Sequence, residues 1–152
     1  MLAAKYTSFM GDALDLAHAA ITMDEVPVGA VIVRNGKIIG QGHNRTRIDH
    51  DPTAHAEIVA IRQATEFLGN DRLEDCDLWV TLEPCTMCAG AIAHARLRRL
   101  YYGADDPKGG AVDSGVRFFD APTCHHRPEV YAGIDGENSA KLLMEFFRGR
   151  RD

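Results

Sequence analysis

Residues 77–88 read DLWVTLEPCTMC and combine a predicted strand, a predicted helix start and two cysteines. We predict a β-strand for DLWVTLE. Glu83-Pro84 then predicts a helix start, because proline fits the first helical position. Cys85 and Cys88, three residues apart in the first turn, would project to the same side of that helix. In α/β domains, functional groups collect where a strand passes into a helix, so this junction is a candidate site.

Helices and strands are predicted to alternate along the chain. The expected helices are 6–23, 52–68, 84–95 and 139–151. The expected strands are 26–33, 37–42, 77–83, 98–104 and 128–134. This order predicts an α/β domain with helices on both faces of one sheet.

Short signals set the expected boundaries of the first elements. Asn35-Gly36 predicts a tight hairpin turn, because both turn positions favour positive φ. Asp51-Pro52 predicts an N-cap and the first helical position of the second helix, and Gly69 predicts its end.

Length and composition favour one globular domain, residues 1–152, in the cytoplasm. No apolar run approaches the roughly 18 residues of a membrane span, and the N-terminus lacks the pattern of a signal peptide. The four cysteines are therefore expected to be reduced rather than paired as disulfides. The net charge of −5 argues against a protein that coats nucleic acid indiscriminately.

A metal site is the first interpretation of the cysteine pair. Cys85 and Cys88 would lie at the partially positive end of a helix, which favours thiolates, and zinc prefers thiolate and imidazole ligands. His55 is also expected in the first turn of its helix. If the two helix starts meet, His55 and both cysteines converge on one ion and leave its fourth position for water.

Glu57 follows His55 by two residues and therefore does not share its helix face. It is poorly placed to bind the same ion but could exchange protons with the activated water. Two alternatives stay open at this point. The C-x-x-C pair could be a redox motif, or Cys76 or Cys124 could complete a purely structural zinc site.

The segments HAE, residues 55–57, and PCTMC, residues 84–88, resemble the H-x-E…P-C-x-x-C signature of the zinc-dependent nucleobase deaminases. Nearly the whole chain resembles the bacterial tRNA adenosine deaminases of the cytidine/deoxycytidylate deaminase superfamily. The segments that carry this similarity are EVPVGAVIV, GHNRT, DPTAHAEI, WVTLEPCTMCAGAI, YYGADDPKGGA and FFRGRR. The resemblance implies a cytidine-deaminase-like three-layer α/β/α sandwich with a five-stranded mixed sheet. It also implies a homodimer whose active-site region is completed across the interface.

The resemblance further implies hydrolytic conversion of the wobble adenosine of an arginine tRNA to inosine. His55, Cys85 and Cys88 would bind one Zn²⁺ per subunit, and Glu57 would shuttle protons. The tRNA anticodon stem-loop would be the partner, with no role for DNA or a membrane. The implied substrate contacts are Asn44, Val28, the backbone amide of Ala56, Asp106, Lys108, Phe147, Arg148 and Arg151.

Two other functions share parts of this pattern. Guanine deaminases carry the same signature, so only EVPVGAV and the basic end FFRGRR favour tRNA over a free base. A zinc module that binds RNA without catalysis predicts four protein ligands. The segment DSGVRFFDAPTCHHRPEV departs from the best-known members, and it leaves His125 and His126 without a predicted role.

Overall fold

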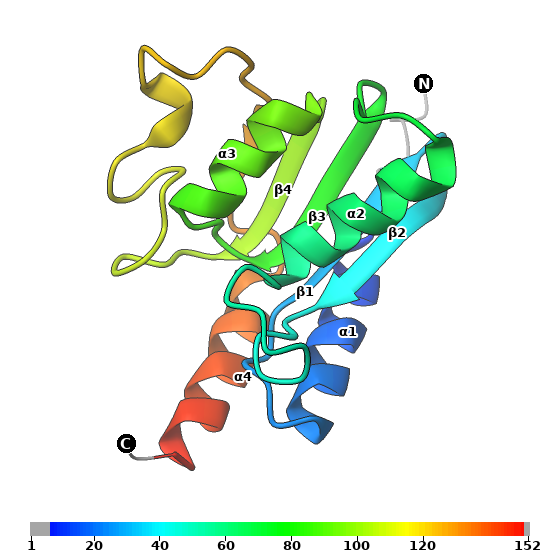
Figure 1. Cartoon of the computed structure of the whole chain (residues 1–152). Coiled ribbons are helices and arrows are strands. Elements are labelled where there is room, and N and C mark those ends of the chain that lie inside the picture. The colour runs from blue at the N-terminus through cyan, green and yellow to red at the C-terminus, as the bar shows by residue number, and fades with distance from the viewer. Residues whose placement is uncertain (1–6, 151–152) are drawn as a thin grey trace, which may run out of the picture.

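The computed structural model describes residues 7–150, and Figure 1 shows their arrangement. The helices are α1 (Met10–Thr22), α2 (Ala56–Leu68), α3 (Thr86–Ala95) and α4 (Gly136–Arg148), with a short 3₁₀ helix at Phe118–Asp120. The strands are β1 (Gly29–Arg34), β2 (Lys37–His43), β3 (Cys76–Leu82), β4 (Arg99–Ala104) and β5 (Glu129–Tyr131).

The five strands form one mixed sheet in the order β2-β1-β3-β4-β5. Strand β1 is antiparallel to both neighbours, whereas β3, β4 and β5 are parallel to one another. The predicted hairpin joins β1 to β2, with φ of 50° at Asn35 and 76° at Gly36. The predicted α/β class and the five-stranded mixed sheet are confirmed.

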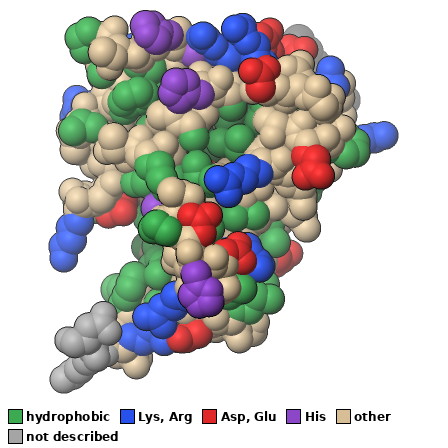
Figure 2. Space-filling model, in the orientation of Figure 1, with side chains coloured by type: hydrophobic (Ala, Val, Ile, Leu, Met, Phe, Trp, Pro, Cys, Tyr) green, Lys and Arg blue, Asp and Glu red, His purple; other side chains and the backbone are tan. Residues whose placement is uncertain are grey.

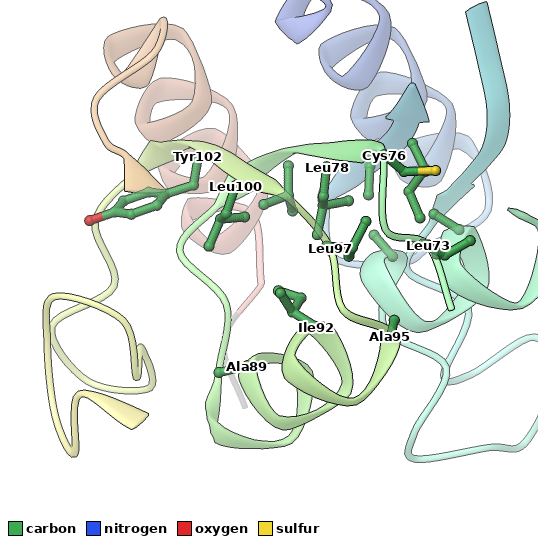
Figure 3. Packing of buried hydrophobic residues seen from close by; sticks show 14 of the residues in the cluster. Leu73, Cys76, Leu78, Ala89, Ile92, Ala95, Leu97, Leu100 and Tyr102 are labelled. Atoms are coloured by element: carbon green, nitrogen blue, oxygen red, sulfur yellow. The ribbon is translucent and has the colours of Figure 1, made fainter. Parts of the chain in front are cut away.

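Helices α2 and α3 cover one face of the sheet, and α1 and α4 cover the other (Figure 1). The larger core cluster lies beneath α2 and α3. There Leu78 and Leu100, from adjacent strands, face Ile92 of α3 (Figure 3). Burial of each such side chain contributes about 1.5–3 kcal/mol. The smaller cluster, which includes Met10 and Trp79, lies beneath α1. The expected three-layer arrangement is therefore confirmed.

Gly42 on β2 allows α2 to approach the sheet closely. A Cβ atom there would lie 2.6 Å from Cγ1 of Val59, inside the contact distance of two carbon atoms. The absence of that atom positions the first turns of α2 against the end of β2.

Two predicted helix starts are wrong. Helix α2 begins at Ala56 rather than at Pro52, because the Asp51 carboxylate accepts hydrogen bonds from the backbone N–H and hydroxyl of Thr53 and closes a local turn instead. Helix α3 begins at Thr86 rather than at Pro84, and Cys85 is still extended, with ψ of 177°. Both candidate ligands His55 and Cys85 thus immediately precede their helices.

Smaller shifts affect the other boundaries. Helix α1 begins at Met10 rather than at residue 6, which lies outside the described residues, and α4 begins at Gly136, three residues earlier than expected. Strand β1 begins at Gly29, and β5 is shorter than 128–134. Among residues 7–150, no helix has the length and apolar character needed to cross a bilayer.

Candidate metal centre and binding pocket

The sheet topology brings the two signature segments together. Strands β2 and β3 are both antiparallel to β1, so they run in the same direction and end at the same edge of the sheet. Helices α2 and α3 start beyond that edge and return over the same face. The residues that immediately precede them, His55 and Cys85, therefore meet.

His55, Cys85 and Cys88 form a compact donor cluster. The Nδ1 atom of His55 lies 3.6 Å from Sγ of Cys85 and 3.5 Å from Sγ of Cys88. All three ligand atoms lie within 4.8 Å of one another, and no other such cluster of His, Cys, Asp or Glu occurs in residues 7–150. Zinc bonds of about 2.3 Å to sulfur and about 2.0–2.1 Å to nitrogen at tetrahedral angles require N···S distances of about 3.5–3.6 Å. The cluster therefore fits a tetrahedral ion with one open position.

Cys85 is the cysteine of the cluster whose surroundings favour a thiolate. Hydrogen bonds from the Cys88 thiol and from His55 lower the pKa of Cys85 to about 4. The hydrogen bond to Cys85 and burial of the sulfur raise the pKa of Cys88, and contact with Cys85 raises the pKa of His55. A bound cation would replace the shared proton and compensate both sulfurs, because metal ligands bind in their deprotonated forms.

Glu57 lies in the first turn of α2 and is only 4% exposed. Burial raises the pKa of its carboxyl to about 7, because the charged form loses its hydration. A group with this pKa can both accept and donate a proton near neutral pH. Glu57 lies outside the three-residue donor cluster but lines the same pocket as His55.

A pocket of about 190 Å³ opens at the cluster. This volume is below the roughly 300–1,000 Å³ of typical drug-sized ligand sites, so it suits one small ring system. The lining residues are Val26, Val28, Asn44, His55, Glu57, Leu82, Glu83, Cys85 and Asp106.

Several predicted substrate contacts do line this pocket. Val28 forms an apolar wall, and Asp106 contributes from the loop after β4. Asn44 is 9% exposed, and its side-chain amide has no hydrogen-bond partner among the described residues. Ala56 is fully buried at the start of α2.

The other predicted contacts lie away from the pocket. Lys108 is exposed on the loop that contains Asp106, and Phe147 and Arg148 are exposed at the end of α4. Arg151 lies outside the described residues. On the face shown in Figure 2, basic and acidic side chains are interspersed, which agrees with the absence of a strong overall positive charge.

Asp24 connects the end of α4 to the loop that follows Asn44. Its carboxylate pairs with Arg47, at 2.9 Å, and with Arg150. The Arg150 guanidinium also lies 4.1 Å from the centre of the Phe146 ring. Arg47 and Arg150, which lie near the surface expected to bind RNA, are therefore both paired with Asp24.

Two buried carboxylates near the pocket were not predicted as site residues. Glu83 was interpreted only as part of a helix start, yet it accepts hydrogen bonds from the loop of residues 105–115. Burial opposes its charge, but the hydrogen bonds, first that from the backbone N–H of Asp106, hold its pKa below the usual value. Glu25 accepts hydrogen bonds from the backbone N–H groups of Arg47 and Ile48. Local sequence carries no signal for either role, because the donors lie more than 20 residues away.

Cys76, Cys124 and His126 take part in packing and local hydrogen bonds away from the donor cluster. Cys76 is buried in the main core, and the Cys124 thiol donates a hydrogen bond to the carbonyl of His126. The imidazole of His126 in turn bonds the carbonyl of Leu97, at 2.6 Å. Because neither Cys76 nor Cys124 joins the donor cluster, the described residues provide three candidate metal ligands rather than four.

The fold and this centre define a deaminase-type protein, and the chain belongs to the MafB19-like deaminase family, whose model matches residues 5–151. It is 60% identical over 148 residues to a tRNA-specific adenosine deaminase from Agrobacterium fabrum, covering 97% of each chain. A tRNA-specific adenosine deaminase from Rickettsia bellii is 51% identical, covering 94% of this chain and all of that protein. The resemblance expected from the two motifs is therefore confirmed.

Solved structures agree with the sequence relatives. A tRNA:A34 deaminase studied for A-to-I editing at the wobble position of transfer RNA superimposes with a TM-score of 0.88 at 61% identity. The match covers 89% of this chain and 98% of that one. A guanine deaminase from Bacillus subtilis matches with a TM-score of 0.64 at 34% identity, covering 95% and 94% of the two chains. The tRNA deaminase is thus more similar in both fold and sequence.

Proposed function

We propose that this protein is a zinc-dependent hydrolase that converts adenosine to inosine at the wobble position of a tRNA anticodon, that of an arginine tRNA. The observation that carries the proposal is the position of Glu57. A buried carboxyl with its pKa raised to about 7 lines the same small pocket as two members of the metal-binding cluster. The similarity to tRNA-specific adenosine deaminases supports the choice of substrate.

The three ligands would hold Zn²⁺, which supplies a Lewis acid that lowers the pKa of water to about 7. Glu57 takes the proton of the water that attacks C6 of the base. It delivers that proton to ring N1, then takes the remaining proton from the new C6 hydroxyl and delivers it to the departing amine, so that water and adenosine yield inosine and ammonia. Glu57 returns to its starting state in each cycle, as a general acid–base must.

The walls of the pocket would select and orient the base. The Asn44 side chain lines the pocket, and its amide has no hydrogen-bond partner in residues 7–150, so it can bond the edge of a purine. Val28 supplies an apolar surface for the ring. The backbone N–H of Ala56, between the pocket residues His55 and Glu57, would be a further donor. A pocket this small admits a base only after it leaves its stack, which is easiest in a single-stranded loop. Lys108, Phe147, Arg148 and Arg151 would contact the surrounding RNA, in a homodimeric enzyme of the cytoplasm.

The Glu57→Ala variant tests this assignment. We expect it to retain its metal and to lose roughly 10²–10⁴-fold in turnover, because general acid–base catalysis contributes about that much. Metal content and inosine formation in an anticodon stem-loop RNA are the measurements. Glu66→Ala, which removes an exposed carboxyl from the same helix, is the matched control.

Near-normal inosine formation by Glu57→Ala would rule out its role as the proton shuttle. The wild-type protein should also be incubated separately with guanine, adenosine and cytidine. Inosine formed in the RNA alone supports the proposed substrate class, whereas deamination of free guanine in place of RNA would favour the guanine deaminase alternative.

A further inference from the structure

A single buried carboxylate is hydrogen-bonded to both ends of the loop of residues 105–115. Glu83 is 2% exposed. Its Oε1 atom accepts from the backbone N–H of Asp106 and from the hydroxyl of Ser114, both at 2.9 Å. Its Oε2 atom accepts from the backbone N–H groups of Val112, Asp113 and Ser114, at 2.9–3.1 Å. All five bonds lead to one loop.

Glu83 also connects this loop to the metal-binding segment. It follows the last residue of β3 and precedes Pro84 and the ligand Cys85. Its backbone N–H donates to the carbonyl of Ala104, at 2.9 Å, so the end of β3 is bound to the end of β4. The side chain lines the pocket beside Asp106.

At its Asp106 end the loop is also contacted by the Tyr102 hydroxyl, 3.3 Å from Oδ1 of Asp105, but that hydroxyl has a single proton and lies closer to Asp113. A buried carboxylate is costly unless it is paired or hydrogen-bonded, and Glu83 forms no ion pair with any residue from 7 to 150. The other end of the loop has a second attachment, because the Tyr102 hydroxyl donates to Asp113 at 2.5 Å. A Cβ atom on Gly110 would lie only 2.5 Å from Cδ of Glu83, so the loop packs directly on the carboxylate.

We propose that Glu83 is a positioning residue that holds Asp106 and the adjoining loop in the geometry needed to bind the substrate. The inference rests on the proposed function, because it takes this loop as part of the RNA-binding wall. Glu83 acts through the loop and does not itself exchange protons with the base. Its loss should therefore weaken substrate binding more than it slows the chemical step.

Glu83→Gln is a selective test because of the donor arrangement. A glutamine can direct its oxygen at the three N–H groups of Val112, Asp113 and Ser114. Its NH₂ group then faces the N–H of Asp106, and two donors cannot bond each other. The variant should release the Asp106 end of the loop and keep the other end attached. Glu74→Gln, which changes an exposed carboxylate away from the loop, is the matched control.

Three measurements on each full-length, metal-loaded variant test the inference. We expect metal content to stay unchanged, amide hydrogen exchange at Asp106 to become at least about tenfold faster, and KM for an anticodon stem-loop to rise about tenfold. We expect kcat to stay within about threefold of the wild-type value, as loss of binding alone requires. A purely structural role would instead lower metal content, kcat and thermal stability together, and that result would overturn the inference.

A second variant covers the case in which Glu83→Gln does not fold. Ser114→Ala removes one donor to the carboxylate and leaves the other four, so KM should rise about threefold with kcat unchanged. An unchanged KM would overturn the inference. If the wild-type protein forms no inosine in the RNA, the proposed function fails. If the wild-type protein forms inosine in the RNA and the variants bind the RNA as tightly as the wild type, the proposed function stands and only the proposed role of Glu83 fails.

Discussion

The Nδ1 atom of His55 lies 3.5 Å from the Sγ atom of Cys88, although the two residues are 33 positions apart in the chain. Each residue sits at or beside the N-terminus of a different helix. Their contact depends on two parallel strands, β2 and β3, ending at one edge of the sheet. The metal-binding cluster is thus a consequence of the topology as much as of the motif.

We predict that Cys88→Ser lowers the bound metal to well below one ion per chain. Two remaining ligands bind zinc weakly, because protein zinc sites have at least three ligands from the chain. The unfolding temperature should then no longer respond to a chelator, which lowers it in the wild-type protein. Cys124→Ser is the control, since Cys124 lies outside the cluster. Metal content measured by atomic emission checks both, and full occupancy in Cys88→Ser would contradict the assignment.

We predict that Gly42→Ala destabilises the protein by about 1–3 kcal/mol, the usual cost of overpacking. The added methyl group would meet both Cβ and Cγ1 of Val59, at 2.7 and 2.6 Å, and displace the first turns of α2. Because Glu57 lies in that turn, turnover should fall as well. Chemical denaturation measures the free energy of unfolding.

Gly11→Ala provides the comparison for that variant. Apart from the adjoining residues and the backbone of its own helix, no heavy atom of residues 7–150 lies within 4 Å of the added Cβ, and Gly11 is an exposed position in α1. Alanine is favoured over glycine in helices, so this variant should gain up to about 1 kcal/mol. Equal stabilities for the two variants would show that the approach of α2 to β2 is not tight.

We predict that Asp24→Asn strengthens binding of the anticodon stem-loop about threefold or more, because it frees two cations for phosphates. Asp24 pairs with both Arg47 and Arg150 in the free protein. The free energy of unfolding should change by less than about 1 kcal/mol, since exposed ion pairs contribute little.

The binding measurement requires a control for net charge. Asp71→Asn makes the same change of charge on the exposed segment that follows α2, away from both arginines. Fluorescence titrations at two salt concentrations should show a steeper salt dependence for Asp24→Asn than for Asp71→Asn. Equal affinities of the two variants would show that these arginines do not meet RNA.

The element types were predictable, whereas the starts of the two site helices were not. Strand and helix periodicity extends over many residues, so the α/β class follows from the pattern. The start of α2 depends on which of two local hydrogen-bonding roles Asp51 takes. Asp51 can cap a helix or close a turn with Thr53, and both are local hydrogen bonds of similar strength. The protein adopts the turn, and α2 begins at Ala56.

The sequence by itself determined which side chains are available for chemistry: one imidazole, two cysteine side chains and a carboxyl, at spacings that suit a metal and a proton shuttle. The tertiary structure alone decided that Glu83 and Glu25 are buried beneath loops near the pocket, and that Asp24 lies between two arginines. Motifs are local, so their residues can be recognised in the chain. Burial and hydrogen bonding between distant segments depend on how the strands end and the loops return, which no local pattern specifies.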